Sequence, residues 1–137
     1  MIVDTSALVA IAFGEPGWEA LRKAINSSRC AIPAPALTEF QLVVAGRERD
    51  HPGVRDTFID QMIANGLEVA AYEQRHAKIT AVARDRYGKG NGTGGKLNFG
   101  DLMVYAIAKN RKEPVLCTGN DFATTDLVIH PASRLEP

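Results

Sequence analysis

The sequence has few of the features that mark secreted, membrane-spanning or disulfide-rich proteins. Its 137 residues include only two cysteines, and no apolar run approaches the roughly 20 residues that a membrane-spanning helix needs. The first residues lack the basic start of a signal peptide. Cys30 and Cys117 lie in short apolar runs, so we expect two buried free thiols. We therefore expect a cytoplasmic protein that does not engage a membrane.

Residues for nucleophilic or zinc chemistry are also scarce. The three histidines are spread along the chain, and the sequence has no Gly-x-Ser-x-Gly turn of the kind that carries a hydrolase nucleophile. No group of Cys and His residues has the spacing of a zinc site. These absences argue against a serine hydrolase and against a zinc protein.

The glycine-rich segment of residues 88–95 matches two nucleotide-binding patterns by spacing only. Gly90, Gly95 and Lys96 fit a phosphate-binding P-loop, and three glycines of the segment fit a dinucleotide fingerprint. A P-loop needs Ser or Thr after the lysine, where this chain has Leu97, and both motifs must follow a strand. The preceding residues have helical spacing, so we expect an exposed loop that binds no nucleotide.

Charge is balanced overall but unevenly distributed. The 16 Lys and Arg residues equal the Asp and Glu residues in number, which argues against a generally basic nucleic-acid-binding protein. Residues 74–100, however, carry six basic residues and a single acid. This segment either contacts a polyanion backbone or is an ordinary solvated face. On the first interpretation, the candidate RNA-binding residues are Arg84, Arg86, Lys89 and Lys96.

Hydrophobic periodicity predicts strands that alternate with amphipathic helices. We expect short strands at residues 1–4, 30–32, 67–71, 115–118 and 127–129, with prolines ending the second one. Helices are expected at residues 5–13, 17–27, 35–44, 54–64, 73–87 and 98–110. The alternation indicates a single domain over residues 1–137, an α/β fold of three layers, α/β/α, with a central parallel sheet.

Four carboxylates lie near strand or helix ends: Asp4, Glu39, Asp101 and Asp121. In an open α/β sheet, ligands bind outside the carboxyl ends of the strands, so Asp4 and Asp121 are expected to share a crevice. Two carboxylates about 5 Å apart repel by roughly 3 kcal/mol at an effective dielectric constant near 20. Several acids can share a crevice only if some are protonated or a hard cation lies between them. The leading interpretation is metal-dependent phosphate chemistry.

Structural explanations compete for the first two acids. Asp4 could cap a helix, but Thr5 or Ser6 can do so too, and we therefore expect Asp4 to be free for another role. Glu39 could stabilise a helix start through the macrodipole. Its place at the margin of an apolar stripe suggests that it leans inward, where a carboxylate needs a partner or a metal.

The later acids have similar alternatives. Asp101 lies three residues after Asn98, the spacing of a capping box. Asp121 follows Gly-Asn and could be a turn residue. Asp126 is a fifth acid nearby with a weaker placement. A structural role could explain each acid by itself. One shared site nevertheless explains the placement of all four acids more simply than four independent structural roles.

Three segments give the chain a family resemblance: residues 2–8 (Ile-Val-Asp-Thr-Ser-Ala-Leu), 97–101 (Leu-Asn-Phe-Gly-Asp) and 115–122 (Val-Leu-Cys-Thr-Gly-Asn-Asp-Phe). With these segments the chain resembles PIN-domain ribonucleases, specifically the VapC toxins of VapBC toxin–antitoxin pairs. The resemblance implies a parallel sheet flanked by helices, Mg²⁺ with Mn²⁺ able to replace it, a homodimer, and a VapB-like antitoxin that covers the site.

The resemblance also implies an activity, the hydrolysis of RNA phosphodiester bonds by a metal-activated water. When the family's site residues are matched to this sequence, the resemblance implies four catalytic and metal-binding acids, namely Asp4, Glu39, Asp101 and Asp121. Supporting roles would fall to Thr5, Ser6, Asn98 and Asp126.

Two alternatives from other functional classes stay open at this point. One is a phosphatase or phosphoryl-transfer domain with Asp4 as its nucleophile, although such domains usually have a second acid two residues later, where this chain has Ser6. The other is an inactive PIN fold that only binds a partner protein.

Overall fold

The computed structural model describes residues 1–134, except for the side chain of Asp56. Its centre is a parallel sheet of four strands in the order β3-β2-β1-β4. The strands are β1 (Ile2–Val3), β2 (Ala31–Pro33), β3 (Glu68–Ala70) and β4 (Val115–Leu116). Because β1 pairs with both β2 and β4, the first residues of the chain lie inside the sheet.

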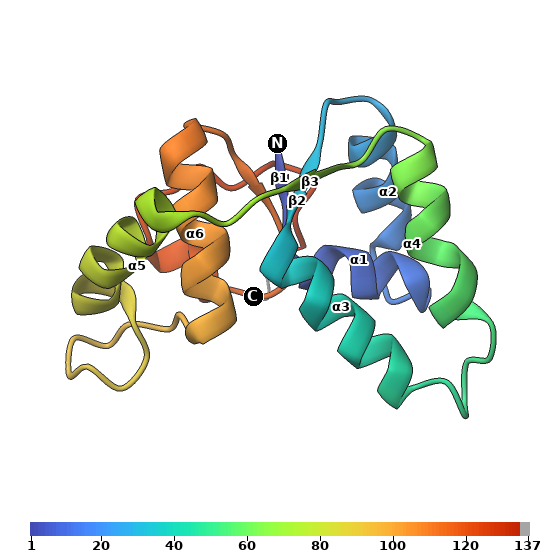
Figure 1. Ribbon diagram of the computed structural model, residues 1–137, viewed down its shortest axis with the longest axis horizontal. Helices are drawn as coiled ribbons and strands as arrows, with labels where there is room; N and C mark the ends of the chain where they lie inside the picture. The colour runs from blue at the N-terminus through green and yellow to red at the C-terminus, as the bar shows by residue number, and fades with distance from the viewer. Residues whose placement is uncertain (135–137) are drawn as a thin grey trace.

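Helices cover both faces of this sheet. Figure 1 shows α5 (Gln74–Tyr87) and α6 (Phe99–Arg111) on one side of the strands and the earlier helices on the other. The earlier helices are α1 (Thr5–Ala12), α2 (Trp18–Asn26), α3 (Ala34–Gly46) and α4 (Val54–Ala64), and a 3₁₀ helix, η1, spans Asp121–Thr124. The expected three-layer α/β/α fold with a parallel sheet is confirmed. Residues 135–137 of the expected domain lie outside the described part of the chain.

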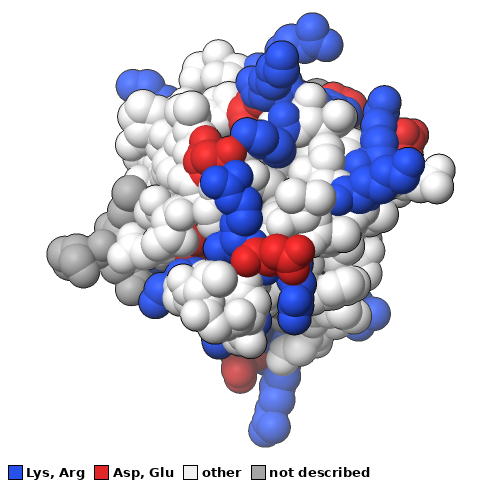
Figure 2. All heavy atoms as spheres, turned by 90° about the vertical axis from the view of Figure 1, so that its left-hand side faces the viewer, with Lys and Arg blue, Asp and Glu red and all other residues white. Residues whose placement is uncertain are grey.

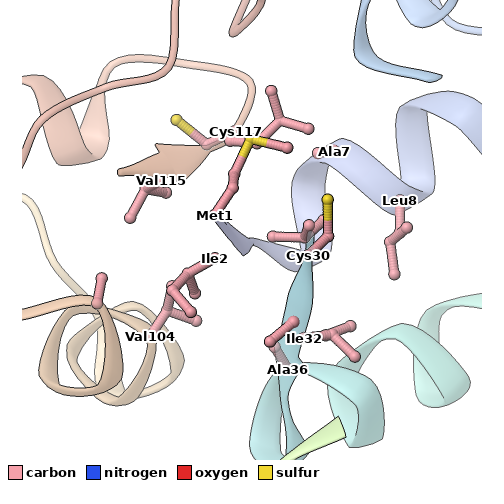
Figure 3. Packing of buried hydrophobic residues seen from close by; sticks show 14 of the residues in the cluster. Met1, Ile2, Ala7, Leu8, Cys30, Ile32, Ala36, Val104, Val115 and Cys117 are labelled. Carbon is pink, nitrogen blue, oxygen red and sulfur yellow. The ribbon is translucent and has the colours of Figure 1, made fainter. Parts of the chain in front are cut away.

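The core is built around β1. Figure 3 shows Ile2 of β1 facing Val104 of α6, while Ala7 lies on the side of α1. The two thiols, Cys30 and Cys117, are buried and free, as expected. Burial raises the pKa of both thiols, that of Cys117 to about 12, so neither is a reactive nucleophile at neutral pH. None of the described helices is long and apolar enough to cross a membrane.

The expected strands differ from the observed ones in length and number, while the helices begin and end close to the expected positions. The sequence predicts that Pro33 ends the second strand, but β2 includes it and pairs it with β3. Proline lacks an N–H but keeps its carbonyl acceptor, which suffices at the last position of a strand. The expected strand at 127–129 does not form, because this segment makes only an isolated bridge between Val115 and Ile129. Pro131 follows closely and cannot donate to a continuing ladder.

Replacing Ile107 by Ala should lower the free energy of unfolding by about 2 to 5 kcal/mol, because this α6 side chain has no exposed surface and its loss leaves a cavity. Leu42→Ala is the matched control, since Leu42 is 69% exposed; it should stay within about 0.5 kcal/mol of the parent. Urea denaturation measures both variants. Similar values for the two would contradict the described packing of α6.

Candidate active site

Five acidic side chains line one hollow of about 300 Å³, namely Glu15 and the four acids that the sequence singles out. Asp4 directly follows β1, Glu39 lies in α3, Asp101 lies in the first turn of α6, and Asp121 begins η1 after β4. Parallel strands have their carboxyl ends at the same edge of the sheet, which brings the segments after β1 and β4 together. The structure thus gathers the four acids that the sequence singles out.

Asp4 is buried and caps α1. Its Oδ2 accepts hydrogen bonds from the backbone N–H of Ser6, at 2.9 Å, and from the Ser6 hydroxyl, at 2.6 Å. The expectation that Thr5 or Ser6 caps this helix is therefore wrong. Both lie inside the helix, whereas Asp4 has the extended backbone of an N-cap residue. Capping fixes the orientation of the buried carboxylate.

The Ser6 hydroxyl also joins the ends of β1 and β4. While it donates to Asp4, it accepts a hydrogen bond from the backbone N–H of Thr118, at 3.0 Å. Thr5 acts elsewhere, because its hydroxyl donates to the carbonyl of Ala36 in α3, at 2.9 Å. Ser6 therefore positions Asp4, and Thr5 ties α1 to α3. Thr118 gives no signal in the sequence, because its contribution comes from the backbone.

Asp101 and Asn98 form a reciprocal capping box at the start of α6. The Asn98 side chain accepts from the Asp101 N–H, at 2.9 Å, and Asp101 Oδ2 accepts from the Asn98 N–H, at 3.0 Å. Both residues also line the acidic hollow. The capping explanation is thus correct for Asp101, yet the same carboxylate faces the other acids.

The pKa values of Asp4, Glu39 and Asp101 are raised in the hollow. Burial is the main cause for Asp101, and the charges of Asp4, Asp121 and Glu39 add to it, so that the pKa of Asp101 rises to about 7. Burial also raises the pKa of Asp4, against the hydrogen bonds from Ser6, and the pKa of Glu39. These shifts show that the carboxylates are costly to keep ionised together without a cation.

Glu39 approaches the start of α6 because residue 100 has no side chain. A Cβ atom on Gly100 would lie 2.5 Å from Glu39 Oε2, closer than non-bonded atoms normally come. Glu39 is exposed and lines the hollow rather than the apolar core. The missing side chain of Gly100 therefore allows the Glu39 carboxylate to lie beside the capping box of α6.

Among the described residues, no three Asp, Glu, Cys or His side chains are already arranged as a metal cluster. Hydrogen bonds hold Asp4 and Asp101, whereas Glu39 and Asp121 are exposed, so their side chains are the ones free to turn inward. The acids lining the hollow offer carboxylate oxygens without thiol or imidazole groups. Such donors suit hard cations such as Mg²⁺ or Mn²⁺.

The four basic residues expected to bind RNA lie in different places. Lys89 and Lys96 line a second hollow, of about 390 Å³, which shares two residues with the acidic one. Arg86 lines a groove between α5 and α6, and Arg84 is exposed beside Asp85. Figure 2 shows Lys and Arg side chains in a band over this side of the molecule, with acidic side chains among them. Of these four residues, only Lys89 and Lys96 line a hollow that adjoins the acids.

The glycine-rich loop follows helix α5 directly. The Lys89 N–H donates to the carbonyl of Leu97, at 2.8 Å, and the Leu97 N–H donates to that of Tyr87, at 2.9 Å, which closes the loop at its base. Neither nucleotide-binding motif has the preceding strand that it requires. The expectation that the loop is not a nucleotide site of either type agrees with this placement.

Asp126 is not among the residues that line the acidic hollow. It accepts a hydrogen bond from the Tyr105 hydroxyl, at 2.7 Å, and pairs with Lys109, at 2.5 Å. The bond from Lys109 is the main cause that lowers the pKa of Asp126. This acid therefore has its own cationic partner, whereas Asp4, Glu39, Asp101 and Asp121 form no ion pair among the described residues.

Arg47 lines the acidic hollow as well, and sequence reasoning missed it. It follows the last residue of α3, eight residues after Glu39, so Glu39, Val43 and Arg47 recur on one helix face. That spacing is a signal in the sequence. The Arg47 guanidinium lies 4.5 Å from the centre of the Phe13 ring, and its Nη1 is 3.6 Å from Glu15 Oε1.

The raised pKa of Asp101 predicts how metal-free protein responds to pH. Between about pH 4, where an unfolded Asp ionises, and about pH 7, its folded pKa, the folded state binds a proton that the unfolded state has lost. Asp101 therefore lowers the free energy of unfolding as pH rises through this window. Asp101→Asn should remove that loss and stabilise the protein at pH 8 in EDTA by roughly 1 to 2 kcal/mol, because one pKa unit corresponds to about 1.4 kcal/mol and solvent screens part of the shift.

The measurement is urea denaturation of parent and variant at pH 4.5 and pH 8, both in EDTA. The variant keeps an oxygen that can accept the Asn98 N–H, so the capping box survives in either case. If the difference in the free energy of unfolding between the two proteins does not grow with pH, the pKa of Asp101 is not raised in the folded protein.

Comparison with known proteins identifies the family of the chain. A family model described as "PIN domain" matches residues 1–127. Ribonuclease VapC42 of Mycobacterium tuberculosis is 37% identical over 129 residues, which cover 93% of this chain and 96% of the relative. Ribonuclease VapC36 of the same species is 39% identical over 130 residues, covering 93% and 91%.

Solved structures share the fold. The crystal structure of M. tuberculosis VapC20, described as a sarcin–ricin loop cleaving toxin, has a TM-score of 0.74 at 14% identity and covers 93% of this chain and 95% of its own. The DNA-bound VapBC of Salmonella typhimurium has a TM-score of 0.65 at 21% identity, covering 98% and 95%. The extent of the family match and the identity to full-length relatives lead to one conclusion: the chain belongs to the PIN-domain family and, within it, to the VapC ribonucleases.

Proposed function

We propose that this chain is a divalent-metal-dependent endoribonuclease, the toxin of a toxin–antitoxin pair, whose catalytic metal site consists of Asp4, Glu39, Asp101 and Asp121. Its relatives at 37% and 39% identity are named ribonucleases, which supports the activity. The observation that carries the site is the shared hollow, in which burial and neighbouring charges raise the pKa of Asp101 to about 7. A cation there would relieve this repulsion.

Mg²⁺ fits the donor set, and Mn²⁺ should replace it, since both take carboxylate oxygens. When bound, such an ion lowers the pKa of water and offsets the charge that develops on a phosphate under attack. The chain's own contribution is to keep four carboxylates close together and to orient two of them. Ser6 holds Asp4, and Asn98 holds Asp101, so two donors are set before a cation arrives.

RNA is the proposed substrate, and we propose that Lys89 and Lys96 bind it, because the hollow that they line adjoins the acids. Lysine–phosphate contacts supply affinity that does not depend on base sequence. Arg84 and Arg86 are exposed on α5. We propose that they contact RNA only outside the segment that is cleaved.

The proposal extends to assembly. Residues 1–137 would form one PIN domain that acts in the cytoplasm, pairs as a homodimer and is inhibited by a VapB-like antitoxin. Support for the antitoxin comes from solved complexes of the same fold, including a toxin–antitoxin complex from Klebsiella pneumoniae.

The alternatives are less well supported. A phosphatase nucleophile must be accessible, but Asp4 is buried, and Ser6 donates two hydrogen bonds to its Oδ2. These bonds reduce the nucleophilicity of the carboxylate. An inactive PIN fold would have no need to keep four acids crowded in one hollow at the cost that the raised pKa of Asp101 indicates.

The proposed activity is tested by incubating the protein with total RNA in Mg²⁺ or in EDTA and mapping the ends. We expect Mg²⁺-dependent cleavage that leaves 5′-phosphate and 3′-hydroxyl ends. Asp101→Asn should lower the cleavage rate by orders of magnitude while the variant stays folded, because one charge of the metal site is lost. Full cleavage by the folded variant would falsify the assignment of Asp101.

Gly100→Ala should separate metal binding from stability. A new Cβ would displace the Glu39 carboxylate, so the rise in melting temperature caused by millimolar Mn²⁺ should shrink. Without metal, stability should hold or rise by up to about 1 kcal/mol, since Ala favours a helix over Gly. Gly46→Ala is the matched control, because nothing lies within 4 Å of its Cβ position. An unchanged Mn²⁺ effect in Gly100→Ala would contradict a role for Glu39.

A further inference from the structure

Arg47 is a cation at the edge of the acidic hollow whose side chain is only loosely engaged. Its guanidinium lies over the Phe13 ring, and the distance of 3.6 Å from Nη1 to Glu15 Oε1 is long for a hydrogen bond. The side chain is 42% exposed. The aromatic ring supports the stem and head of Arg47, while the guanidinium keeps N–H groups that can bind a phosphate.

Lys89 and Lys96 border the acids from a different direction. Their hollow meets the acidic one at Asn98 and Asp121, and it includes no residue of α1 or α3. Arg47, in contrast, reaches the acidic hollow from the end of α3. Among the described residues, neither lysine forms an ion pair, so both are available to a ligand.

Figure 1 shows how the two cationic sites are separated. The glycine-rich loop that carries the lysines lies to the left of the first turn of α6, and the end of α3 lies to its right. The first turn of α6 carries Asp101. A chain that passes from the loop to the end of α3 would therefore cross the acids.

We propose that Arg47 and the pair Lys89 and Lys96 bind RNA phosphates on opposite sides of the bond that is cleaved. The inference rests on the proposed ribonuclease function and adds to it the path of the substrate. The flanking cations attract phosphates on both sides of the centre, where a bound divalent ion would offset the charge of the acids, so an extended single strand is held across the centre at two points. Two-point attachment places the intervening phosphodiester over the acids.

A purely structural role for Arg47 makes different predictions. If it served only to cover Phe13 and pair with Glu15, its loss would change stability and leave RNA affinity and its salt dependence as they are. Arg47→Gln tests this cleanly, because Gln keeps a stem that can lie over the ring while the charge is removed. Arg47→Lys keeps the charge, and Arg49→Ala is the matched control, an exposed arginine of the same turn that does not line the hollow.

The first experiment measures binding of a fluorescein-labelled single-stranded oligoribonucleotide of about 12 nucleotides, within the usual range for single-strand sites. All proteins carry Asp101→Asn, which prevents cleavage, and Mg²⁺ is constant. Each phosphate contact contributes about 0.7 to the slope of log affinity against log salt for single strands. Arg47→Gln should reduce the slope by about 0.7, and Lys89→Gln with Lys96→Gln by about 1.4. Arg47→Lys and Arg49→Ala should keep it.

The second experiment finds which side each cation binds. A neutral methylphosphonate replaces one phosphate of the oligoribonucleotide at a time, and binding is compared with the cleavage position mapped for the parent protein. The replacement that weakens binding by the parent but not by Arg47→Gln identifies the phosphate that Arg47 binds. In the same way, the replacement that weakens binding by the parent but not by Lys96→Gln identifies a phosphate that the lysines bind. The two marked phosphates should flank the cleaved bond.

Each outcome is decisive for one of the two proposals. If the parent does not cleave RNA, the proposed function fails. If it cleaves RNA but Arg47→Gln leaves affinity and salt slope unchanged, or both marks fall on the same side, the two-sided path fails and the function stands. Should Arg47→Gln not fold, the methylphosphonate series with Arg47→Lys and Lys96→Gln decides, because a two-sided path still requires sensitive phosphates on both sides of the cut.

Discussion

Hydrogen bonds that hold the buried Asp4 carboxylate are the constraint on which the rest of the site depends. Asp4 ends β1 and caps α1, and the Ser6 hydroxyl that donates to it also accepts from the backbone of Thr118 after β4. This chain of bonds fixes the ends of two neighbouring parallel strands relative to each other. Asp121, three residues beyond Thr118, is thereby held near Asp4. Without this link, burial of the carboxylate would be costly, since a charged group in the protein interior needs partners.

Crowding of carboxylates explains why this arrangement suits a cation and then a phosphate. Burial and the neighbouring charges raise the pKa of Asp101 to about 7, so the metal-free site is close to taking up a proton at neutral pH. A divalent ion would replace that proton and turn a repulsive centre into one that attracts phosphate oxygens. The cations outside the centre, Arg47 on one side and Lys89 with Lys96 on the other, would then share the same substrate rather than neutralise the acids.

Much of this could be predicted from the sequence, for identifiable reasons. Helical spacing predicted the helices, and alternating strands predicted the parallel sheet, because these periods depend only on local geometry. Asp4, Asp101 and Asp121 were found because they occur at strand and helix ends, and Glu39 because it lies at the margin of an apolar helical stripe. The N-cap role of Asp4 was considered but set aside, because Thr5 and Ser6 are equally good caps by residue type and only the backbone conformation decides. Arg47 was overlooked although its spacing from Glu39 was visible, and the pairing of Asp126 with Lys109 depends on tertiary contacts that no local pattern encodes.

The most direct test of the shared acidic site is a calorimetric titration of the protein with Mn²⁺, carried out near pH 6.5 and near pH 8.5 in two buffers of different ionisation enthalpy. Because Asp101 has a pKa of about 7 in the metal-free protein, binding near pH 6.5 should release protons, and the release should fall toward zero near pH 8.5. Asp101→Asn should bind more weakly and release fewer protons at the lower pH. Absence of Mn²⁺ binding, or binding with the same proton release at both pH values, would contradict the account.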